Sequence, residues 1–261
     1  MKPFRYCASL TNFSIPAGLT SLGDGTFMDC TGLSIFYVDE NNSHFSSQDG
    51  VLYNKEKTVL IAFPAGKSEE SFSIPLGVTN IGRFAFYQSG LSTIAIPSSV
   101  TIIGDFAFIG CSSLTSITVP SGVTEVGNSA FSSCNQLTNI TIPSSVSQIG
   151  NYAFAFSGNL TNVIFESDSR LTNIGEWAFY GCGKLEAFSI SSSVTAIGSG
   201  AFYECIGLVE ISIPVSVTSM GERVFEGCDN ISINIAAESL PGGWNSNWNP
   251  NGRPVVWGYD S

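Results

Sequence analysis

The apolar and polar residues of this chain follow one pattern that repeats along most of its length. The segment Pro120–Ile142 carries it, and aligned with its neighbours it reads P-x-x-V-T-x-I-G-x-x-A-F-x-x-C-x-x-L-T-x-I-x-I. Self-similarity at a period of roughly 20 to 50 residues is the sequence signature of a solenoid or an array of repeats. The chain is therefore predicted to grow by stacking short coils, rather than by closing around one globular core.

Each coil is predicted to hold a strand on one side and a short turn on the other. In Leu114–Val119 the spacing L-x-x-I-x-V places Ile117 and Val119 on the inner face of a strand. In Gly127–Cys134 the apolar spacing changes to i, i+1, i+4, which suits a single helical or 3₁₀ turn with its Phe and Cys inside. About nine coils of about 23 residues, stacked at the strand spacing of about 4.8 Å, would form a rod roughly 40 Å or more long.

One glycine recurs at the same place in each coil and marks a corner that needs a positive φ or a close backbone approach. The positions are Gly23, Gly82, Gly104, Gly127, Gly150, Gly175, Gly198 and Gly221. Prolines end the alternating runs, because proline has no N–H for a strand ladder. They are Pro16, Pro75, Pro97, Pro120, Pro143 and Pro214. These two sets of residues therefore predict the corners of the coils and no active site.

Between the first two of these glycines the period breaks. Val51–Tyr53 and Thr58–Phe63, split by Asn-Lys-Glu-Lys, predict a β-hairpin. We expect the hairpin to continue the stack within an atypical coil at about residues 39–75; the alternative is a hairpin that binds a partner. The only histidine, His44, lies in the approach to it. A single histidine leaves no zinc triad, and a lone loop histidine is usually solvated.

The tail, residues 236–261, breaks the pattern a second time, after a solenoid predicted to occupy residues 1–235. It holds three of the four tryptophans, Trp244, Trp248 and Trp257. One interpretation is that they cover the exposed face of the last coil, as the end of a solenoid requires. The other is a carbohydrate platform, in which tryptophans flanked by asparagines stack on sugar rings.

The repeat resembles a known family. The run L-x-x-I-x-I-P followed by V-T-x-I-G-x-x-A-F-x-x-C is similar to the leucine-rich repeats of the BspA-like (Treponema pallidum-type) class. The similarity covers residues 4 to about 235 and keeps these phenylalanines in register: Phe4, Phe27, Phe86, Phe108, Phe131, Phe154, Phe179, Phe202 and Phe225. The resemblance implies a curved, right-handed leucine-rich repeat solenoid with a parallel sheet on its concave face.

The resemblance also implies a cell-surface or secreted, adhesin-type protein that binds a host matrix protein or a microbial surface protein. The first residues do not read as a signal peptide. We therefore expect either a protein that stays inside the cell or a trimmed piece of an exported one. The first coil lacks the first half of its repeat, so we expect upstream repeats, another domain or self-association to cover its apolar edge.

The cysteines all lie three residues after a repeat phenylalanine, and serine fills the same place in two coils. They are Cys7, Cys30, Cys111, Cys134, Cys182, Cys205 and Cys228, with Ser89 and Ser157 in the remaining places. The chain has no C-x-x-C pair, which predicts no metal site and no cofactor. Neighbouring coils would allow disulfides, between Cys111 and Cys134 or among Cys182, Cys205 and Cys228. The odd count and the serines favour a ladder of buried free thiols.

The composition excludes two classes of partner. Lys and Arg number 10 against 21 Asp and Glu, a net charge of -11, and no basic run could follow a phosphate backbone. We therefore expect no nucleic-acid partner. No apolar run reaches the roughly 18 residues of a membrane helix, which predicts no membrane insertion of this chain. Because only 12% of the residues are charged, serine, threonine and asparagine must make much of the surface polar.

The outward strand positions are mostly small and polar, without a base to activate a hydroxyl group and without paired carboxylates. We therefore expect no catalytic residue and no enzyme. Such a face offers a broad hydrogen-bonding surface to a macromolecule. The candidate partner-binding residues are Ile35, Tyr37, Thr93, Ser116, Thr118, Asn139, Thr141, Asn162, Ile164, Ser189 and Glu210. Two hypotheses remain beside carbohydrate binding by the tail: a protein-binding module, and a stiff spacer with no partner of its own.

Overall fold

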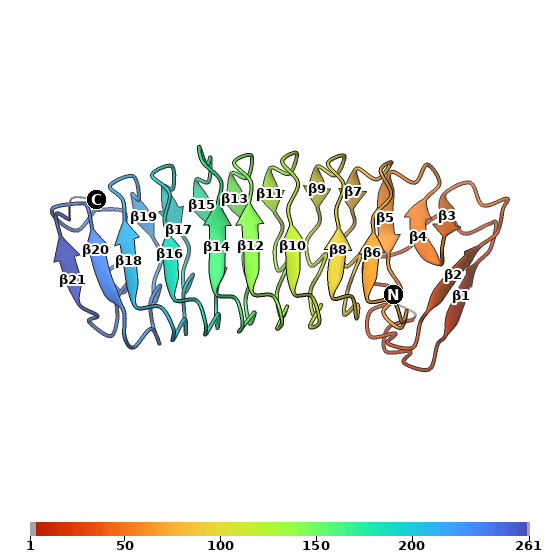
Figure 1. Cartoon of the computed structure of the whole chain (residues 1–261), viewed down its shortest axis with the longest axis horizontal. Helices are drawn as coiled ribbons and strands as arrows, with labels where there is room; N and C mark the ends of the chain where they lie inside the picture. Colours follow the sequence, from red (N-terminus) through yellow and green to blue (C-terminus); the bar gives the residue numbers. More distant parts are fainter. Residues whose placement is uncertain (1–3, 260–261) are drawn as a thin grey trace.

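The computed structural model describes residues 4–259 as a rod of stacked coils. Figure 1 shows the coils following one another along the long axis, from the first strands in red to the last in blue, with a second row of strands behind the first. The predicted repeat solenoid is confirmed, with about 11 turns of about 23 residues rather than nine. Residues 1–3 of the predicted solenoid and 260–261 of the predicted tail lie outside the described residues.

Strands of three or four residues form the nearer row in Figure 1, in three parallel sheets. The first sheet pairs β1 (Asn12–Ile15) with β2 (Ile35–Val38). The second joins β6 (Ser71–Ser73), β8 (Thr93–Ala95), β10 (Ser116–Thr118), β12 (Asn139–Ile142) and β14 (Asn162–Phe165). The third joins β16 (Ala187–Ser189), β18 (Glu210–Ile213), β20 (Ser232–Ile235) and β21 (Val255–Trp257).

The farther row is one sheet of ten strands. It begins with the four-residue strands β3 (Phe45–Gln48), β4 (Val51–Asn54) and β5 (Val59–Ala62). It continues with strands of two residues: β7 (Asn80–Ile81), β9 (Ile102–Ile103), β11 (Glu125–Val126), β13 (Gln148–Ile149), β15 (Asn173–Ile174), β17 (Ala196–Ile197) and β19 (Ser219–Met220). Each coil from β6 to β19 thus contributes one strand to each row.

The parallel register sets equivalent residues of successive coils side by side. Ile117 pairs with Ile140 in the nearer row, and Val126 pairs with Ile149 in the farther row. All four side chains are buried. The alternation of the strands therefore points the same apolar positions inward in every coil, as predicted for Ile117.

The turn that carries the repeat phenylalanine is not the helical or 3₁₀ turn predicted from its spacing, and residues 4–259 contain no helix. Ser129 and Ser133 both have a positive φ, at 51° and 59°, which a right-handed helix does not allow. The N–H groups of Ser129, Phe131 and Ser133 donate to carbonyl groups of the next coil. Those of Ala130 and Ser132 donate to the residue three before them. Tandem turns thus form a hydrogen-bonded ladder along the rod.

The repeat phenylalanines form a stacked column inside the rod. From Phe86 to Phe225 the ring centroids of neighbours lie 5.0 to 5.7 Å apart. Phe63 extends the column at 5.5 Å from Phe86, and Trp248 ends it at 6.2 Å from Phe225. Each of the two is 23 residues from the neighbour that it contacts. These two places account for the turns beyond the nine predicted.

The predicted hairpin is present and belongs to the stack. β4 pairs antiparallel with β5, and β5 pairs parallel with β7. The strand β3, which was not predicted, pairs antiparallel with the other side of β4. The hairpin and β3 therefore supply three strands to the farther row, where a regular coil supplies one.

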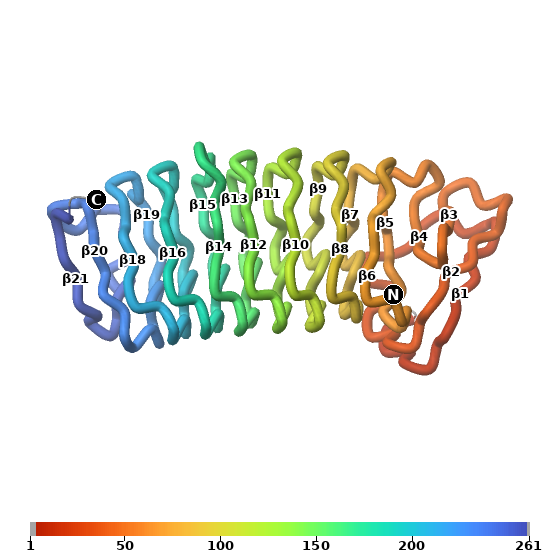
Figure 2. The backbone as a smooth tube through the Cα atoms, viewed as in Figure 1, coloured from red at the N-terminus to blue at the C-terminus, as the bar shows by residue number. Residues whose placement is uncertain are grey.

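The nearer row is interrupted beside this hairpin, because no pairing joins β2 to β6 in the part of the chain that the structure describes. The core divides at the same place. A small cluster around Leu33, Phe36 and Phe45 lies on one side, and the long core that runs to Trp248 lies on the other. In Figure 2 the tube through β1 and β2 is inclined to the other coils. We call residues 22–66 the junction and residues 71–235 the regular stack.

Candidate functional site

Nine of the predicted partner-binding residues lie on the outer side of the second and third sheets of the nearer row. We call them the strand row: Thr93, Ser116, Thr118, Asn139, Thr141, Asn162, Ile164, Ser189 and Glu210. All are exposed except Thr141, which is half-buried. Within the second sheet Ser116 pairs with Thr93 and Asn139, and Asn162 Nδ2 donates to Asn139 Oδ1 at 2.9 Å. The row is a polar surface whose side chains partly bond one another.

The structure does not bring all the predicted residues together. Ser189 and Glu210 lie on the third sheet, which is not paired with the second. Ile35 and Tyr37 lie on β2, on the other side of the junction. Tyr37 is 53% exposed, whereas Ile35 is half-buried against Gly50. The two apolar anchors on β2 are thus separate from the strand row.

An exposed group of aromatic side chains lies on the turns of three successive coils. We call it the aromatic patch: Tyr152, Phe156, Trp177, Tyr180 and Tyr203. Tyr152 and Phe156 are 42% and 48% exposed, and the other three are half-buried. The Trp177 ring is 5.2 Å from Tyr203 and 5.6 Å from Tyr180. Phe156 lies 4.5 Å from Tyr180.

The turn conformation produces this patch. Tyr152, Phe156 and Trp177 occupy positive-φ positions, two residues before or after a repeat phenylalanine. In the next coil the same position is Gly200, with φ of 60°. A Cβ atom there would lie 2.5 Å from Cε3 of Trp177. The glycine therefore leaves the space in which the indole ring lies.

Charged groups surround the patch unevenly. Arg223 lies over the Tyr203 ring at 5.5 Å and donates to both carboxylate oxygens of Glu226, at 2.6 and 3.1 Å. The hydrogen bond from Arg223 holds the pKa of Glu226 below its ordinary value. Desolvation, with Glu204 nearby, raises the pKa of Tyr180 above its ordinary value. The patch thus combines aromatic rings with one paired guanidinium group.

The sequence prediction missed the aromatic patch because outward residues were sought on the strands only. The signal was present in the register. Aromatic residues fall two before or one after the repeat phenylalanine in successive coils, as in Tyr152, Trp177, Tyr180 and Tyr203. Stacking coils of equal length brings such positions together.

The tail tryptophans have different environments. Trp244 and Trp248 are both 6% exposed, and Trp244 Nε1 donates to the carbonyl oxygen of Val217 at 2.9 Å. The N–H of Val224 donates to the carbonyl oxygen of Trp248, which continues the turn ladder of the coils. Trp257 on β21 is 38% exposed. Only Trp257 therefore presents an accessible ring, and two of the three proposed sugar-stacking residues do not.

The cysteines have a structural place rather than a reactive one. All seven are free thiols, and all but Cys7 are buried. Sulfur atoms donate to the phenylalanine carbonyl group of the preceding coil, as from Cys111 to Phe86 at 3.0 Å. Ser157 makes the same bond to Phe131 at 2.9 Å. A small side chain with one donor therefore suits this position, which explains why serine replaces cysteine there.

No group of three or more His, Cys, Asp or Glu side chains within residues 4–259 could hold a metal ion. The same residues include no helix that is long and apolar enough to span a membrane.

Comparison with protein-family models matches the chain to the family described as BspA type Leucine rich repeat region. The match comprises six copies, over residues 1–69, 61–182 and 128–240. A search of curated proteins gives no match.

Solved structures of bacterial leucine-rich repeat proteins are similar to this chain. A leucine-rich repeat protein from Eubacterium ventriosum is 29% identical with a TM-score of 0.79, over 90% of this chain and 61% of that one. The T. pallidum leucine-rich repeat protein is 26% identical with a TM-score of 0.54, over 78% and 82%. The pneumococcal vaccine antigen PcpA is 22% identical with a TM-score of 0.57, over 95% and 56%, and indicates the fold alone. This chain thus spans less than two thirds of the E. ventriosum protein.

Proposed function

The chain belongs to the BspA-type leucine-rich repeat family, and from this premise we propose that it is a non-catalytic protein-binding module of a cell-surface or secreted protein. Leucine-rich repeat proteins are interaction modules as a class, which supports the general role. The finer proposal is an adhesin-type contact with a host matrix protein or a microbial surface protein. We place that contact at the aromatic patch.

The observation that carries this proposal is the partly exposed cluster of tryptophan, tyrosine and arginine on adjacent coils. Residues that dominate protein interfaces are enriched in these three types, and they cluster in the centre of the contact. Trp177 is the central member, because it contacts Tyr152, Tyr180 and Tyr203. The rigid turns hold these rings in place before a partner arrives, which lowers the entropy cost of binding.

Charge indicates the kind of partner. Glu176 and Glu204 are exposed on the turns of the patch, Glu222 is exposed on the turn of the next coil, and the chain carries a net charge of -11. A partner with apolar side chains at the centre of its contact and lysine or arginine at the rim would complement this surface. The strand row is the second candidate surface, because its exposed amide and hydroxyl groups can bond a polar partner.

The test is binding of the purified chain to a panel of immobilised matrix and mucosal proteins, measured by biolayer interferometry at low and high salt. Trp177→Ala should weaken a specific interaction by about tenfold or more, the loss typical of a central contact. Phe106→Ala is the matched control, since it changes the same turn position of another coil. Asn139→Ala combined with Asn162→Ala tests the strand row.

The outcomes separate the hypotheses. Loss of binding in the strand-row variant alone would move the contact to that surface. Absence of any partner across the panel would favour the alternative hypothesis that the chain is a stiff spacer with no partner of its own. Binding to glycans that is abolished by Trp257→Ala would favour the carbohydrate alternative, for which Trp257 offers the one accessible ring of the tail tryptophans named above.

A further inference from the structure

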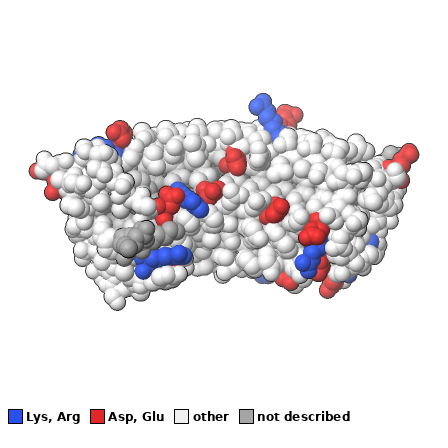
Figure 3. Space-filling model, turned by 180° about the vertical axis from the view of Figure 1, so that it is seen from behind, with Lys and Arg blue, Asp and Glu red and all other residues white. Residues whose placement is uncertain are grey.

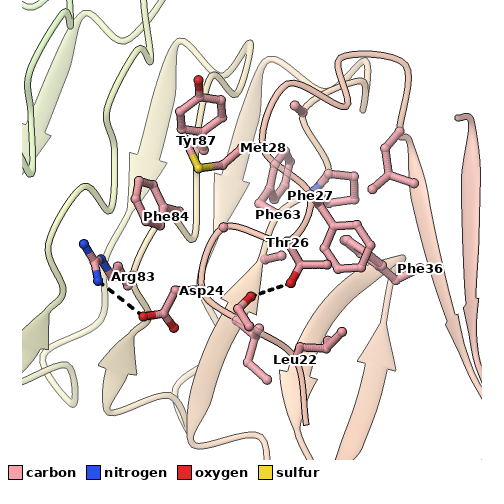
Figure 4. A pocket seen from close by; sticks show the side chains of 18 of the residues that line it. Leu22, Asp24, Thr26, Phe27, Met28, Phe36, Phe63, Arg83, Phe84 and Tyr87 are labelled. Carbon is pink, nitrogen blue, oxygen red and sulfur yellow. Dashed lines mark hydrogen bonds and ion pairs between the residues drawn. The ribbon is translucent and has the colours of Figure 1, made fainter. Parts of the chain in front are cut away.

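The junction contains a cavity, which lies where the regular stack begins. Its volume is about 260 Å³, and it lies between the Leu22–Met28 segment, strand β5 with the residues that follow it, and the Gly82–Tyr87 turn. Figure 4 shows Leu22 and Thr26 between Phe84 and Arg83 on one side and Phe36 on the other, with Phe63 above them in this view. The lining therefore joins the small N-terminal core to the first coil of the regular stack.

The cavity arises because the turn ladder stops at the hairpin. In regular coils the repeat phenylalanine and the residues two before and two after it donate to the next coil, as Phe84, Phe86 and Gln88 do. The equivalent residues in the junction are Gly25, Phe27 and Asp29. Across residues 4–259, no acceptor bonds their N–H groups. The edge of β5 that would accept them is already paired with β4.

Two of these free donors belong to the cavity wall. Gly25 and Phe27 line it, and Gly25 keeps the positive φ of the regular turns, at 62°. The ladder bonds of regular coils run along the rod to the following coil. The same backbone conformation therefore turns these N–H groups towards β5, on the side where the cavity lies. An unpaired donor in an apolar surrounding favours a ligand that carries an acceptor.

Most of the other lining side chains are apolar, beside the polar groups of Asp24, Thr26, Arg83 and Tyr87. Phe27, Ile61 and Phe84 are half-buried, whereas the repeat phenylalanines of the regular stack are fully buried. An apolar cavity of about 150 Å³ stays dry and takes up benzene. The space of about 260 Å³ therefore has room for one aromatic ring or a short acyl chain with a small polar group.

Charges around the cavity decide against an anionic ligand. Arg83 Nη1 is 3.4 Å from Asp24 Oδ2, so the one guanidinium group of the lining already has a carboxylate partner. The Tyr87 hydroxyl donates to Asp29 Oδ1 at 2.9 Å, and Arg5 lies 3.8 Å from Asp29 Oδ2. Among the described residues that line the cavity, the only cation is therefore already paired with a carboxylate.

We propose that the junction cavity binds a small neutral molecule with an aromatic ring or short alkyl chain and one carbonyl-type acceptor, which the Gly25 and Phe27 N–H groups receive. The ring would pack against Phe27, Ile61 and Phe84. Such a ligand would close the gap in the turn ladder and fix the first two coils against the rest of the rod. This site is separate from the aromatic patch and does not depend on the function proposed for it.

The test uses ¹⁹F NMR of three fluorinated probes of similar size with the whole chain. 4-Fluoroacetophenone carries a neutral acceptor, 4-fluorotoluene carries none, and 4-fluorobenzoate carries an anionic one. We expect saturable binding of 4-fluoroacetophenone, at least about threefold tighter than that of the other two. Ala62→Leu, which adds bulk to the lining, should abolish it. Leu22→Ala, at the half-buried rim, should weaken it about threefold to tenfold, while Leu76→Ala, an exposed leucine outside the lining, should not change it.

Each result decides the proposal. Absence of saturable 4-fluoroacetophenone binding would overturn it, as would binding that neither lining variant changes. Equal binding of all three probes would overturn the assignment of the donors, and preference for 4-fluorobenzoate would overturn the neutral class. Because Ala62→Leu could unfold the chain, its thermal melting curve is compared with that of the wild type. If Ala62→Leu is unfolded, the effect of Leu22→Ala on probe binding decides the proposal.

Discussion

In the regular stack each turn donates its N–H groups to the next coil, and each repeat phenylalanine packs between two others. In the junction the same turn, around Phe27, has no coil to donate to, because β3 and the two hairpin strands occupy that place. The turn around Phe27 nevertheless carries the same sequence pattern as the turns of the stack. In a regular repeat, neighbouring coils therefore already bond the turn N–H groups and cover the inward rings. Groups that could bind another molecule remain only where the period is interrupted or where side chains face outward.

The two candidate sites follow this division. The aromatic patch lies in the regular stack and uses outward positions of the turns, so it forms a surface rather than a cavity. The junction cavity uses inward positions that the interruption leaves open. A large partner suits the first, and a small molecule suits the second. Four predictions examine how far the two regions differ, beginning with the largest effect.

Alkaline pH should destabilise the regular stack by several kcal/mol. Burial raises the pKa of Cys111, Cys182 and Cys228 from 9.0 to about 12. Above pH 9 the thiols of the unfolded chain lose their protons while those of the folded chain keep them. The stability present below pH 9 is therefore lost as the pH rises towards 12, by about 1.4 kcal/mol per thiol and pH unit. Urea unfolding at pH 8 and pH 11 measures the loss.

The matched protein for this experiment carries Cys111→Ser, Cys182→Ser and Cys228→Ser. All other ionisable groups are common to both proteins, so the difference between their pH profiles isolates the three thiols. Identical profiles would mean that burial of the thiols contributes nothing to the alkaline loss.

Truncation of a column phenylalanine should distinguish the two regions. Phe131→Ala removes a fully buried ring stacked 5.1 Å from Phe108 and 5.5 Å from Phe154, and should cost about 3–5 kcal/mol. Phe27→Ala removes a half-buried ring beside an existing cavity, and should cost about 1–2 kcal/mol. Guanidine unfolding of both variants measures the free energies. Equal losses would show that the junction is packed as tightly as the stack.

A glycine of the junction should tolerate no side chain. A Cβ atom on Gly66 would lie 2.6 Å from backbone atoms of Thr31 and Gly32, so Gly66→Ala must displace the first coils and should cost about 2 kcal/mol. Gly90→Ala is the control, because a Cβ atom there meets nothing within 4 Å. It should be neutral or slightly stabilising. If Gly66→Ala melts at the temperature of the wild type, the contact between residue 66 and the second coil is not a constraint.

Much of the fold could be predicted because the same apolar spacing recurs in every coil, so that each coil confirms the interpretation of the others. The inward place of Ile117 and the column of Phe131 recur in coil after coil, and the hairpin between residues 51 and 63 has its own turn residues. The column positions of Phe63 and Trp248 were missed because one lay in the hairpin and the other in the tail. Their spacing of 23 residues from Phe86 and Phe225 would have identified them.

The turn conformation and both candidate sites could not be predicted in the same way. The spacing of Phe131 and Cys134 suits a helical turn as well as tandem turns, and only glycines such as Gly110 and Gly181 hint at a positive φ. The junction cavity depends on which edge of β5 is paired, and strand pairing is a property of the folded chain. The break in the sequence period therefore locates the junction, but it does not predict the cavity that the structure shows there.

The smallest effect is expected for Ser157→Cys, because the ladder position requires a small donor rather than a thiol. Ser157 donates to the Phe131 carbonyl oxygen at 2.9 Å, and Cys134 donates in the same way to Phe108 at 3.3 Å. The substitution should therefore change the free energy of unfolding by less than about 0.5 kcal/mol. Ser157→Ala leaves that buried carbonyl group without its donor and should cost about 1–3 kcal/mol. In the junction the same position is Gly66, where backbone fills the space. If Ser157→Cys costs as much as Ser157→Ala in chemical unfolding, the hydroxyl group itself is required, and cysteine and serine are not equivalent in the stack.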